Sequence, residues 1–226
     1  MGDFFHLPDW AQPVAEYMIH TGLVGTLRIA VVAVIGAAVV GIVLGVLFTL
    51  PVTATRWAIR LYIEVWRGLP IIVTIFLLYF ALPDLGIRLN AFNAAALGLI
   101  LWGSAQIAEA TRGAIQSVPR EQHEAAAALG FGWAGSQSFV ILPQAFRRLL
   151  PPLVSLLVNV IQNTTIAALI GVAEVLQSGQ RSVERLQLTP PGNSHALEIY
   201  GAVLVVFFVI SFPLTRLAAL LEKRLV

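Results

Sequence analysis

The stretch IAVVAVIGAAVVGIVLGVLFTL, residues 29–50, carries no charged side chain and only one hydroxyl, on Thr49. A helix needs about 20 apolar residues to cross the hydrocarbon core of a bilayer. The rest of the chain fits this setting, because 58% of its 226 residues are hydrophobic and only 12% are charged. Soluble domains carry about 25% charged residues. Residues 29–50 therefore predict a transmembrane helix in a membrane protein.

Four further apolar segments follow this first span. They are residues 68–83, 89–108, 149–173 and 199–215. The shortest, residues 68–83, is expected to extend back through LYIEVWR, which places Glu64 and Arg67 at the membrane edge. We expect Pro151 and Pro152 to start the fourth of the five spans, because proline suits the first turn of a helix.

The resulting prediction is an all-α, polytopic membrane helical bundle with five transmembrane helices and a single domain, residues 1–226. Residues 1–22 are expected to form an outer N-terminal segment, with Trp10 and Tyr17 near headgroup depth. Residues 177–198 contain Pro-Pro-Gly and are interpreted as a solvated outer loop. In the first span, Gly41 and Gly45 lie at a spacing that lets helices approach closely, within the chain or between chains.

The distribution of lysine and arginine predicts how the bundle is oriented. With the N-terminus outside, nine basic residues fall in inner segments and three in outer segments, while Arg28 and Arg67 lie at span edges. The inner ones are Arg56, Arg60, Arg112, Arg120, Arg147, Arg148, Arg216, Lys223 and Arg224, and the outer ones are Arg88, Arg181 and Arg185. Basic residues concentrate in cytoplasmic loops. The N-terminus is therefore predicted outside and the C-terminus inside.

This orientation places residues 112–148 in the cytoplasm. Within them, REQHEAAAALG is rich in good helix formers and ends at Gly130, a residue suited to terminating a helix. A second short helix is expected to follow and to end near Pro143. From composition alone, two interpretations stay open: a compact projection that docks a partner, or an amphipathic linker lying on the membrane.

The same segment resembles the EAA loop of bacterial ABC importer permeases. The match is EAAAALG, then nine residues, then VILP, with Val140 where the family usually has Ile. The runs SAQIAEATRGAIQSVPREQHEAA and WRGLPIIVTIFLLYFALP resemble the polar amino-acid branch of that family. The residues that match the loop motif and are implied to contact the ATPase are Glu124, Ala125, Ala126, Gly130, Leu142 and Pro143.

This resemblance implies a permease subunit in the bacterial inner membrane that couples to a separate ATPase. The implied partners are two ABC ATPase subunits, a second permease copy or related permease, an extracytoplasmic solute-binding protein and the lipid bilayer. ATP and Mg would be bound by the ATPase subunits, and no cofactor by this chain. Pro143 is implied to end the second helix of the loop.

A substrate pathway is expected along the fourth span. Asn159, Gln162 and Asn163 recur at helical spacing, with Thr164 beside them. Amides in hydrocarbon need hydrogen-bond partners, so these residues either join helices or line a path. Glu109 lies three residues before Arg112 and is either a local ion pair or a pathway charge. Glu174, just past this span, is expected to face the outside.

Several classes of function are excluded or left as alternatives by what the sequence contains. There is no cysteine and no P-loop, and the only lysine is Lys223. No His-Glu-x-x-His motif occurs, so an enzyme is not expected. The net charge of +2 is too small to indicate nucleic acid. A gradient-driven carrier or channel, or a scaffold or signalling membrane protein, stays open as an alternative to the importer subunit.

Overall fold

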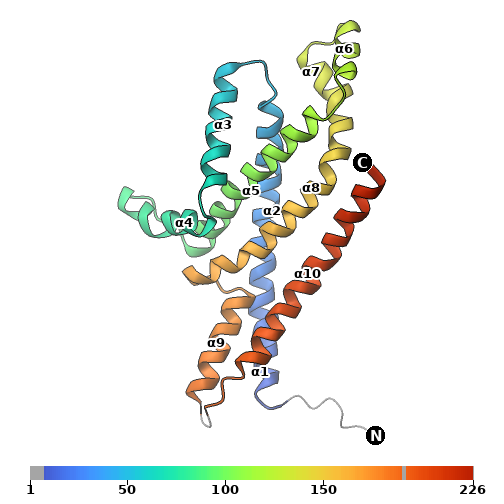
Figure 1. Ribbon diagram of the computed structural model, residues 1–226. Helices are drawn as coiled ribbons and strands as arrows, with labels where there is room; N and C mark the ends of the chain where they lie inside the picture. The colour runs from blue at the N-terminus through green and yellow to red at the C-terminus, as the bar shows by residue number, and fades with distance from the viewer. Residues whose placement is uncertain (1–7, 190–191, 226) are drawn as a thin grey trace.

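The computed structural model describes residues 8–189 and 192–225. Within this part of the chain every regular element is a helix (Figure 1), as expected for an all-α bundle. The elements are α1 (Ala11–Tyr17), η1 (Met18–Leu23), α2 (Val24–Leu47), α3 (Thr53–Gly68), α4 (Ile71–Phe76), η2 (Leu77–Ala81), η3 (Leu82–Leu85), α5 (Ala91–Gln116), α6 (Arg120–Ala128), α7 (Trp133–Ser136), η4 (Gln137–Ile141), α8 (Leu142–Gln162), η5 (Asn163–Ile170), α9 (Val175–Leu188) and α10 (Ala196–Leu225).

Four continuous helical stretches are long and apolar enough to cross a membrane. They are Ala11–Leu47, Ala91–Gln116, Trp133–Ile170 and Ala196–Arg224. A fifth crossing is present if Thr53–Gly68 and Ile71–Leu85 are taken together as one broken span. The predicted count of five is reached in that way, with the second span as the irregular one.

The second span is not the continuous helix that the sequence predicted. Its two halves meet at an angle of 102°. Leu69 has φ −85° and ψ 136°, an extended conformation, and Pro70 follows with ψ 130°. Proline has no N–H to donate and disfavours a helical conformation in the residue before it. The break therefore follows from Pro70, which the count of apolar residues ignored.

The fourth span also begins elsewhere than predicted. The helix is continuous from Trp133, and Pro151 and Pro152 lie inside α8 rather than at its start. Ala145, Leu149 and Leu153 recur every fourth residue on its buried face, so packing continues past the prolines. Only two backbone N–H groups are lost at the pair, and the packed face holds the helix together.

The predicted outer loop, residues 177–198, is largely helical. Helix α9 runs from Val175 to Leu188, and its buried face is made of small and polar residues such as Ser178, Gly179 and Ser182. Small residues let helices approach closely even without an apolar pattern. In the Pro-Pro-Gly segment, Gly192 has φ 81°, and the two prolines lie outside the described residues.

Helices α2 and α5 pack closely at the centre of the bundle. A Cβ on Gly41 would lie 2.7 Å from the Ser104 carbonyl oxygen, and one on Gly45 would lie 2.6 Å from that of Ala108. Ala37, one turn before Gly41, is fully buried. The small residues of the first span therefore form a packing seam within the chain, which is one of the two predicted alternatives.

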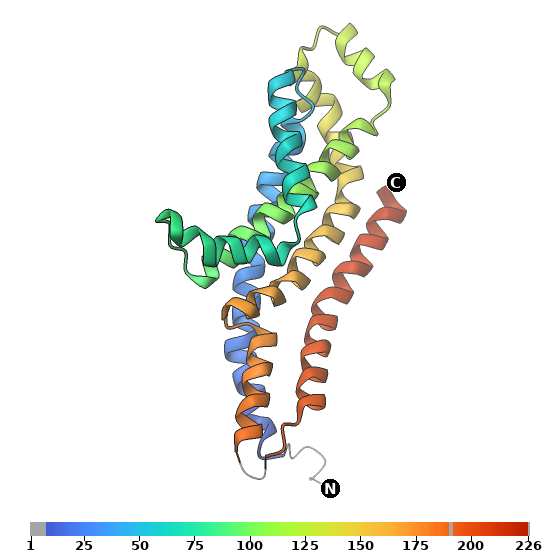
Figure 2. The same cartoon turned by 60° about the vertical axis from the view of Figure 1, so that its left-hand side comes forward.

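The bundle has two distinct ends (Figure 1). Helices α6 and α7 project at one end, beside the turn between α2 and α3, and we call this the α6 end. The start of α1 and the connection from α9 to α10 lie at the opposite end, which we call the α1 end. Figure 2 shows the same separation from a second direction, with α10 running between the two ends.

Candidate functional site

The projection at the α6 end is built around a left-handed glycine. Helix α6 begins at Arg120, after Pro119, and its last turn is closed by hydrogen bonds from Gly130 N to Ala127 O, 2.9 Å, and from Phe131 N to Ala126 O, 3.1 Å. Gly130 has φ 82°, while nothing lies within 4 Å of where its Cβ would be. Glycine is therefore required there by backbone conformation and not by space.

The predicted coupling residues take different positions on this projection. Ala126 is buried, whereas Glu124 and Ala125 are exposed. The Glu124 carboxylate accepts from Arg120 Nε at 2.9 Å, but both side chains are mostly exposed, 64% and 89%. An ion pair this exposed contributes little to stability, so both groups can exchange it for another partner.

Leu142 and Pro143 lie at the start of α8, away from the tip. Pro143 does not end the second helix, as the family resemblance implied, because α7, η4 and α8 follow one another without a break. The π-helical turn Gln137–Ile141 comes directly before it. Such wide turns occur where the regular helical hydrogen-bond pattern is interrupted, and Pro143 has no N–H to add to that pattern.

Two contacts join the projection to the membrane-length helices. Gln144 on α8 donates to Gln122 on α6 at 3.1 Å, and also to the Val140 carbonyl oxygen at 2.9 Å. Arg148, one turn further along α8, donates to the carbonyl and the hydroxyl of Ser117. Helix α6 is therefore held to the start of α8, and α8 is in turn held to the end of α5.

The tip carries exposed apolar side chains that the sequence analysis missed. Leu129 is 77% exposed and Phe139 is 73% exposed. Phe131 is also exposed, and its ring centroid lies 6.1 Å from that of Phe139. The sequence did offer a signal for this patch, because Leu129 and Phe131 flank Gly130 in a segment that is otherwise polar. Exposed apolar patches often mark protein–protein contacts.

A polar cavity of about 700 Å³ lies between α3, α5, α8 and α10. Its charged and amide lining groups include Arg67, Gln106, Glu109 and Glu222. Arg67 Nε donates to Gln106 Oε1 at 3.1 Å, and Glu109 Oε2 accepts from Arg112 Nε at 3.0 Å. Glu109 therefore forms the predicted local ion pair and also lines this cavity, and its role as a pathway charge stays a prediction.

The amides of the fourth span lie outside this cavity. Gln162 Nε2 donates to Ser211 Oγ on α10 at 3.3 Å, and Asn163 Nδ2 donates to the Asn159 carbonyl oxygen at 2.8 Å. Asn159 is exposed, one turn beyond Ser155, which does line the cavity. Thr164 is fully buried and donates to the Ile161 carbonyl oxygen at 2.7 Å. The structure therefore brings Asn159 close to the cavity's face of α8 and turns Thr164 inward.

Residues 37–226 match the family described as "Binding-protein-dependent transport system inner membrane component". The chain belongs to this family. The glutamine transport system permease protein GlnP of Escherichia coli K12 is 36% identical over 221 residues, covering 96% of this chain and 97% of that protein. The probable amino-acid ABC transporter permease protein YckA of Bacillus subtilis is 40% identical over 156 residues, covering 69% of each chain.

Solved structures of related transporters share the fold of this family member. A crystal structure of an amino acid ABC transporter with histidines matches with a TM-score of 0.82 at 29% identity, over 97% of this chain and all of that one. The MetNI methionine ABC transporter, in an inward-facing conformation, matches with a TM-score of 0.75 at 18% identity, over 95% and 99% of the two chains. The second likeness shows the fold alone.

In this family member Glu174 does not face the outside, as the sequence had suggested. Its side chain is fully buried, and its carboxylate caps α9 by accepting from the Gln177 backbone N–H at 2.6 Å. The Thr26 hydroxyl lies 3.5 Å from the same carboxylate and also accepts from the Val175 N–H at 3.1 Å. Burial raises the pKa of Glu174 to about 7, against the lowering effect of these hydrogen bonds. Glu174 therefore joins α9 to α2 as a structural residue.

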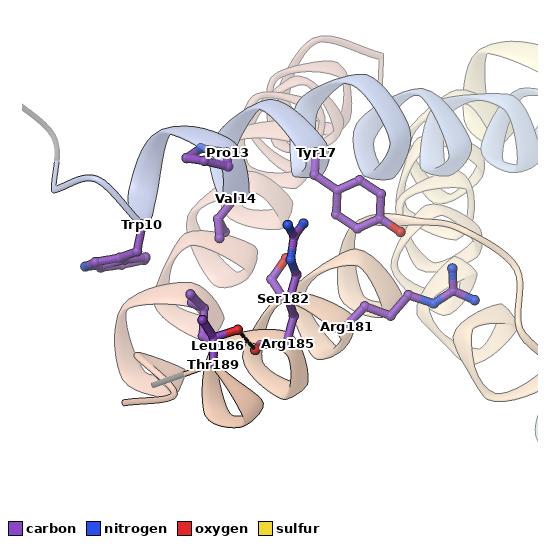
Figure 3. A pocket seen from close by; sticks show the side chains of 9 residues that line it. All are labelled: Trp10, Pro13, Val14, Tyr17, Arg181, Ser182, Arg185, Leu186 and Thr189. Carbon is purple, nitrogen blue, oxygen red and sulfur yellow. Dashed lines mark hydrogen bonds between the residues drawn. The ribbon is translucent and has the colours of Figure 1, made fainter. Parts of the chain in front are cut away.

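A groove of about 400 Å³ lies at the α1 end, between α1 and α9. Figure 3 shows Trp10 and Tyr17 on one side and the side chains of Arg181 and Arg185 rising from α9 on the other. Trp10 also stacks on His195, with ring centroids 4.0 Å apart. The predicted headgroup-level aromatics therefore contact the helix that follows the fourth span. Among the described residues no group of His, Asp and Glu is placed to hold a metal ion.

Proposed function

We propose that this chain is the transmembrane permease subunit of an ATP-driven importer of polar amino acids. The observation that carries the proposal is the helical projection at the α6 end, turned by Gly130 and tied to α5 and α8. Near-full-length similarity to a glutamine permease supports the substrate class. The membrane-length helices supply the pathway, and the projection supplies the contact with the energy source.

In this proposal the ATPase subunits bind ATP and Mg and contact the projection. The exposed Glu124 and Ala125 and the apolar tip with Leu129 and Phe139 form the contact surface. Movement of α6 would reach α8 through the Gln122–Gln144 hydrogen bond, and α8 is tied to the end of α5 through Arg148 and Ser117. One chain offers one projection, so a second permease copy or a related permease completes the transporter.

We place the substrate path along the polar cavity and the adjoining amides of α8. An amino acid carries a carboxylate and an ammonium group, which Arg67 and Glu109 would complement. Asn159, Gln162 and Asn163 would continue the path with neutral hydrogen-bonding groups. The outer surface would receive a solute-binding protein, with the N-terminus outside and the C-terminus inside.

Reconstitution into liposomes tests the energy source. The chain, assembled with its ATPase and binding protein, is expected to take up amino acid only when ATP is supplied on the side of the α6 projection. Uptake by the chain alone, without ATP, would show a gradient-driven carrier. Absence of uptake with all partners and a panel of amino acids would instead favour a scaffold or signalling role.

Asn163→Leu tests the path without touching the projection. We expect lower transport or altered selectivity, because leucine removes the amide while keeping a similar side-chain volume. The measurement is initial uptake rate against substrate concentration in the reconstituted system, at equal amounts of inserted protein. Unchanged kinetics would assign Asn163 to helix packing.

A further inference from the structure

A basic cavity of about 500 Å³ lies at the α6 end, where α2, α3, α5 and the projection meet. Its lining includes four arginines and a histidine, Arg56, Arg60, Arg112, Arg120 and His123. In the described part of the chain, no aspartate or glutamate lines it. Arginines that converge on one space without an intervening acid make a site for an anion.

Most of these arginines keep donors free for a ligand. Arg60, Arg112 and Arg120 each pair with a glutamate on their own helix, at 3.9 Å for the Arg60–Glu64 pair and at shorter distances for the others. A guanidinium has five N–H donors, and one carboxylate occupies at most two. Arg112 also donates to Gln116 Oε1 at 2.5 Å, which leaves two of its donors free. Among the described residues, no carboxylate lies within 4 Å of Arg56.

Two residues that line the cavity, Trp133 and Gln137, each carry a buried polar atom that lacks a partner among the described residues. Gln137 is only 5% exposed and its Oε1 has no donor. Trp133 Nε1 likewise has no acceptor. Buried polar atoms nearly always have partners, so an unpartnered donor and acceptor in a cavity wall indicate a ligand. Together they suit a group that has both acceptor oxygens and a hydroxyl.

An apolar surface continues directly from the mouth of the cavity. A second hollow of about 240 Å³ shares Phe48, Arg56 and Arg60 with it and is bounded by Trp57. Trp57, Leu61 and Val65 recur every fourth residue on α3 and are 66%, 64% and 40% exposed. A charged head and an apolar tail can therefore be accommodated side by side on α3.

We propose that this cavity binds the headgroup of an anionic glycerophospholipid, of the phosphatidylglycerol type. The phosphate contacts the arginines and the Trp133 N–H, a glycerol hydroxyl donates to Gln137, and the acyl chains lie on Trp57, Leu61 and Val65. The cavity is level with Phe48, beside the last residues of the first apolar run, which is the depth of lipid headgroups. Basic pockets between membrane helices are known to bind such headgroups.

The apolar stripe decides between a lipid and a soluble phosphate compound. A soluble ligand would contact the arginines alone and make no use of the adjoining apolar stripe. The site shares no lining residue with the polar cavity between α3, α5, α8 and α10, although part of its lining belongs to the projection that the proposed function assigns to the ATPase contact.

Photo-crosslinking with an activatable phosphatidylglycerol tests the site on the full-length chain in nanodiscs. Label is expected on peptides that contain residues 53–66, and phosphatidylcholine of the same chain length is expected to label them weakly. Arg56→Gln with Arg60→Gln should weaken phosphatidylglycerol binding roughly 25-fold, at about fivefold for each arginine. Arg56→Lys with Arg60→Lys should retain most of the phosphatidylglycerol binding. This variant also controls for folding, because it changes the same two residues and keeps their charge.

Arg181→Gln with Arg185→Gln is the matched control, because this pair has the same spacing and charge and lies on α9, at the opposite end of the bundle from α6 (Figure 1). It should leave labelling of residues 53–66 unchanged. Equal loss in both double variants would show a general charge effect and overturn the proposal. If millimolar glycerol phosphate displaced the label from residues 53–66, the cavity would be a site for soluble anions. If the label disappeared when the chain assembles with the ATPase, the surface would be a protein contact. Either result would also overturn it.

Discussion

Gly130 shows how one residue controls the shape of the projection at the α6 end. At φ 82° an alanine would be strained by about 1–2 kcal/mol, although its Cβ would meet no neighbour. We expect Gly130→Ala to lower transport-coupled ATP hydrolysis while membrane insertion is retained, because α6 lies outside the spans. The measurement is ATPase activity of the reconstituted complex with and without substrate.

Gly132→Ala is the control for that substitution. Gly132 has φ −70°, and nothing lies within 4 Å of its Cβ position, so alanine adds the same methyl group without strain. Coupling should be preserved in this variant. Equal loss in both variants would indicate that the added methyl groups block a partner, and the backbone conformation of Gly130 would not be the cause.

Glu174 gives the fold a dependence on pH. Because burial raises its pKa from 4.5 to about 7, the folded chain retains this proton between those two pH values, where the unfolded chain releases it. At low pH the protonated Glu174 therefore contributes up to about 3 kcal/mol to the free energy of unfolding. This contribution is lost as the pH rises through about 7.

We expect Glu174→Gln to flatten the pH dependence of unfolding and to be more stable than the unchanged chain at pH 8. Glutamine keeps an oxygen that can accept from the Gln177 N–H. Thermal unfolding in detergent between pH 5 and pH 8 measures the effect. Glu184→Gln, on the exposed face of the same helix, should leave the slope as it is. Parallel pH profiles for the Glu174 variant and the unchanged chain would refute the linkage.

At the scale of elements, the seam between α2 and α5 sets how closely the bundle can pack. A Cβ on Gly45 would lie 2.4 Å from Thr111 Cβ and 2.6 Å from a backbone oxygen, so Gly45→Ala must push the helices apart. Overpacking of this kind costs about 1–3 kcal/mol. We expect a lower unfolding temperature and a smaller monodisperse fraction in detergent.

Gly113→Ala, on α5, is the comparison for the seam. It lies in the same helix pair but has nothing within 4 Å of its Cβ position. Alanine favours helix by about 1 kcal/mol over glycine, so this variant should be neutral or slightly stabilised. If both variants lose stability equally, close approach at Gly45 is not what limits the pair.

The elements also show what sequence patterns could and could not predict. Runs of apolar residues located the spans, and the composition of residues 120–130 predicted α6 with its glycine end. Pro70 broke a helix where Pro151 and Pro152 did not, because only the surrounding packing decides whether a helix continues past a proline. Helix α9 escaped prediction because its buried face consists of Ser178, Gly179 and Ser182, which resemble loop residues.

The candidate site was predictable only where a motif is local. The predicted coupling residues lie within one segment of chain, and their spacing predicted α6 with its glycine end but not the separation of Leu142 and Pro143, which lie at the start of α8. The polar cavity combines Arg67, Gln106 and Glu222 from three separate helices, and no spacing in the sequence relates them. Glu174 was misplaced for the same reason, since its hydrogen-bond partner Thr26 is far away along the chain.

At the scale of the whole molecule, the proposed orientation can be tested directly because the chain has no cysteine. Single cysteines introduced at His123, on α6, and at Asn193, between α9 and α10, would be the only thiols present. We expect a membrane-impermeant maleimide to label position 193 in intact cells and position 123 only after the membrane is opened. The reverse pattern would invert the orientation.

The unbroken helix from Trp133 to Ile170 has a mechanical consequence. Its 38 residues have a contour length of roughly 55 Å, with the near end held to α6 by Gln144 and the far end leading to the Glu174 cap. Tilting a rod of this length by about 5° would displace its tip by about 5 Å, nearly one helical turn. In the proposed transporter, a small movement of α6 would therefore be amplified along this helix into a displacement of several ångströms at the α1 end.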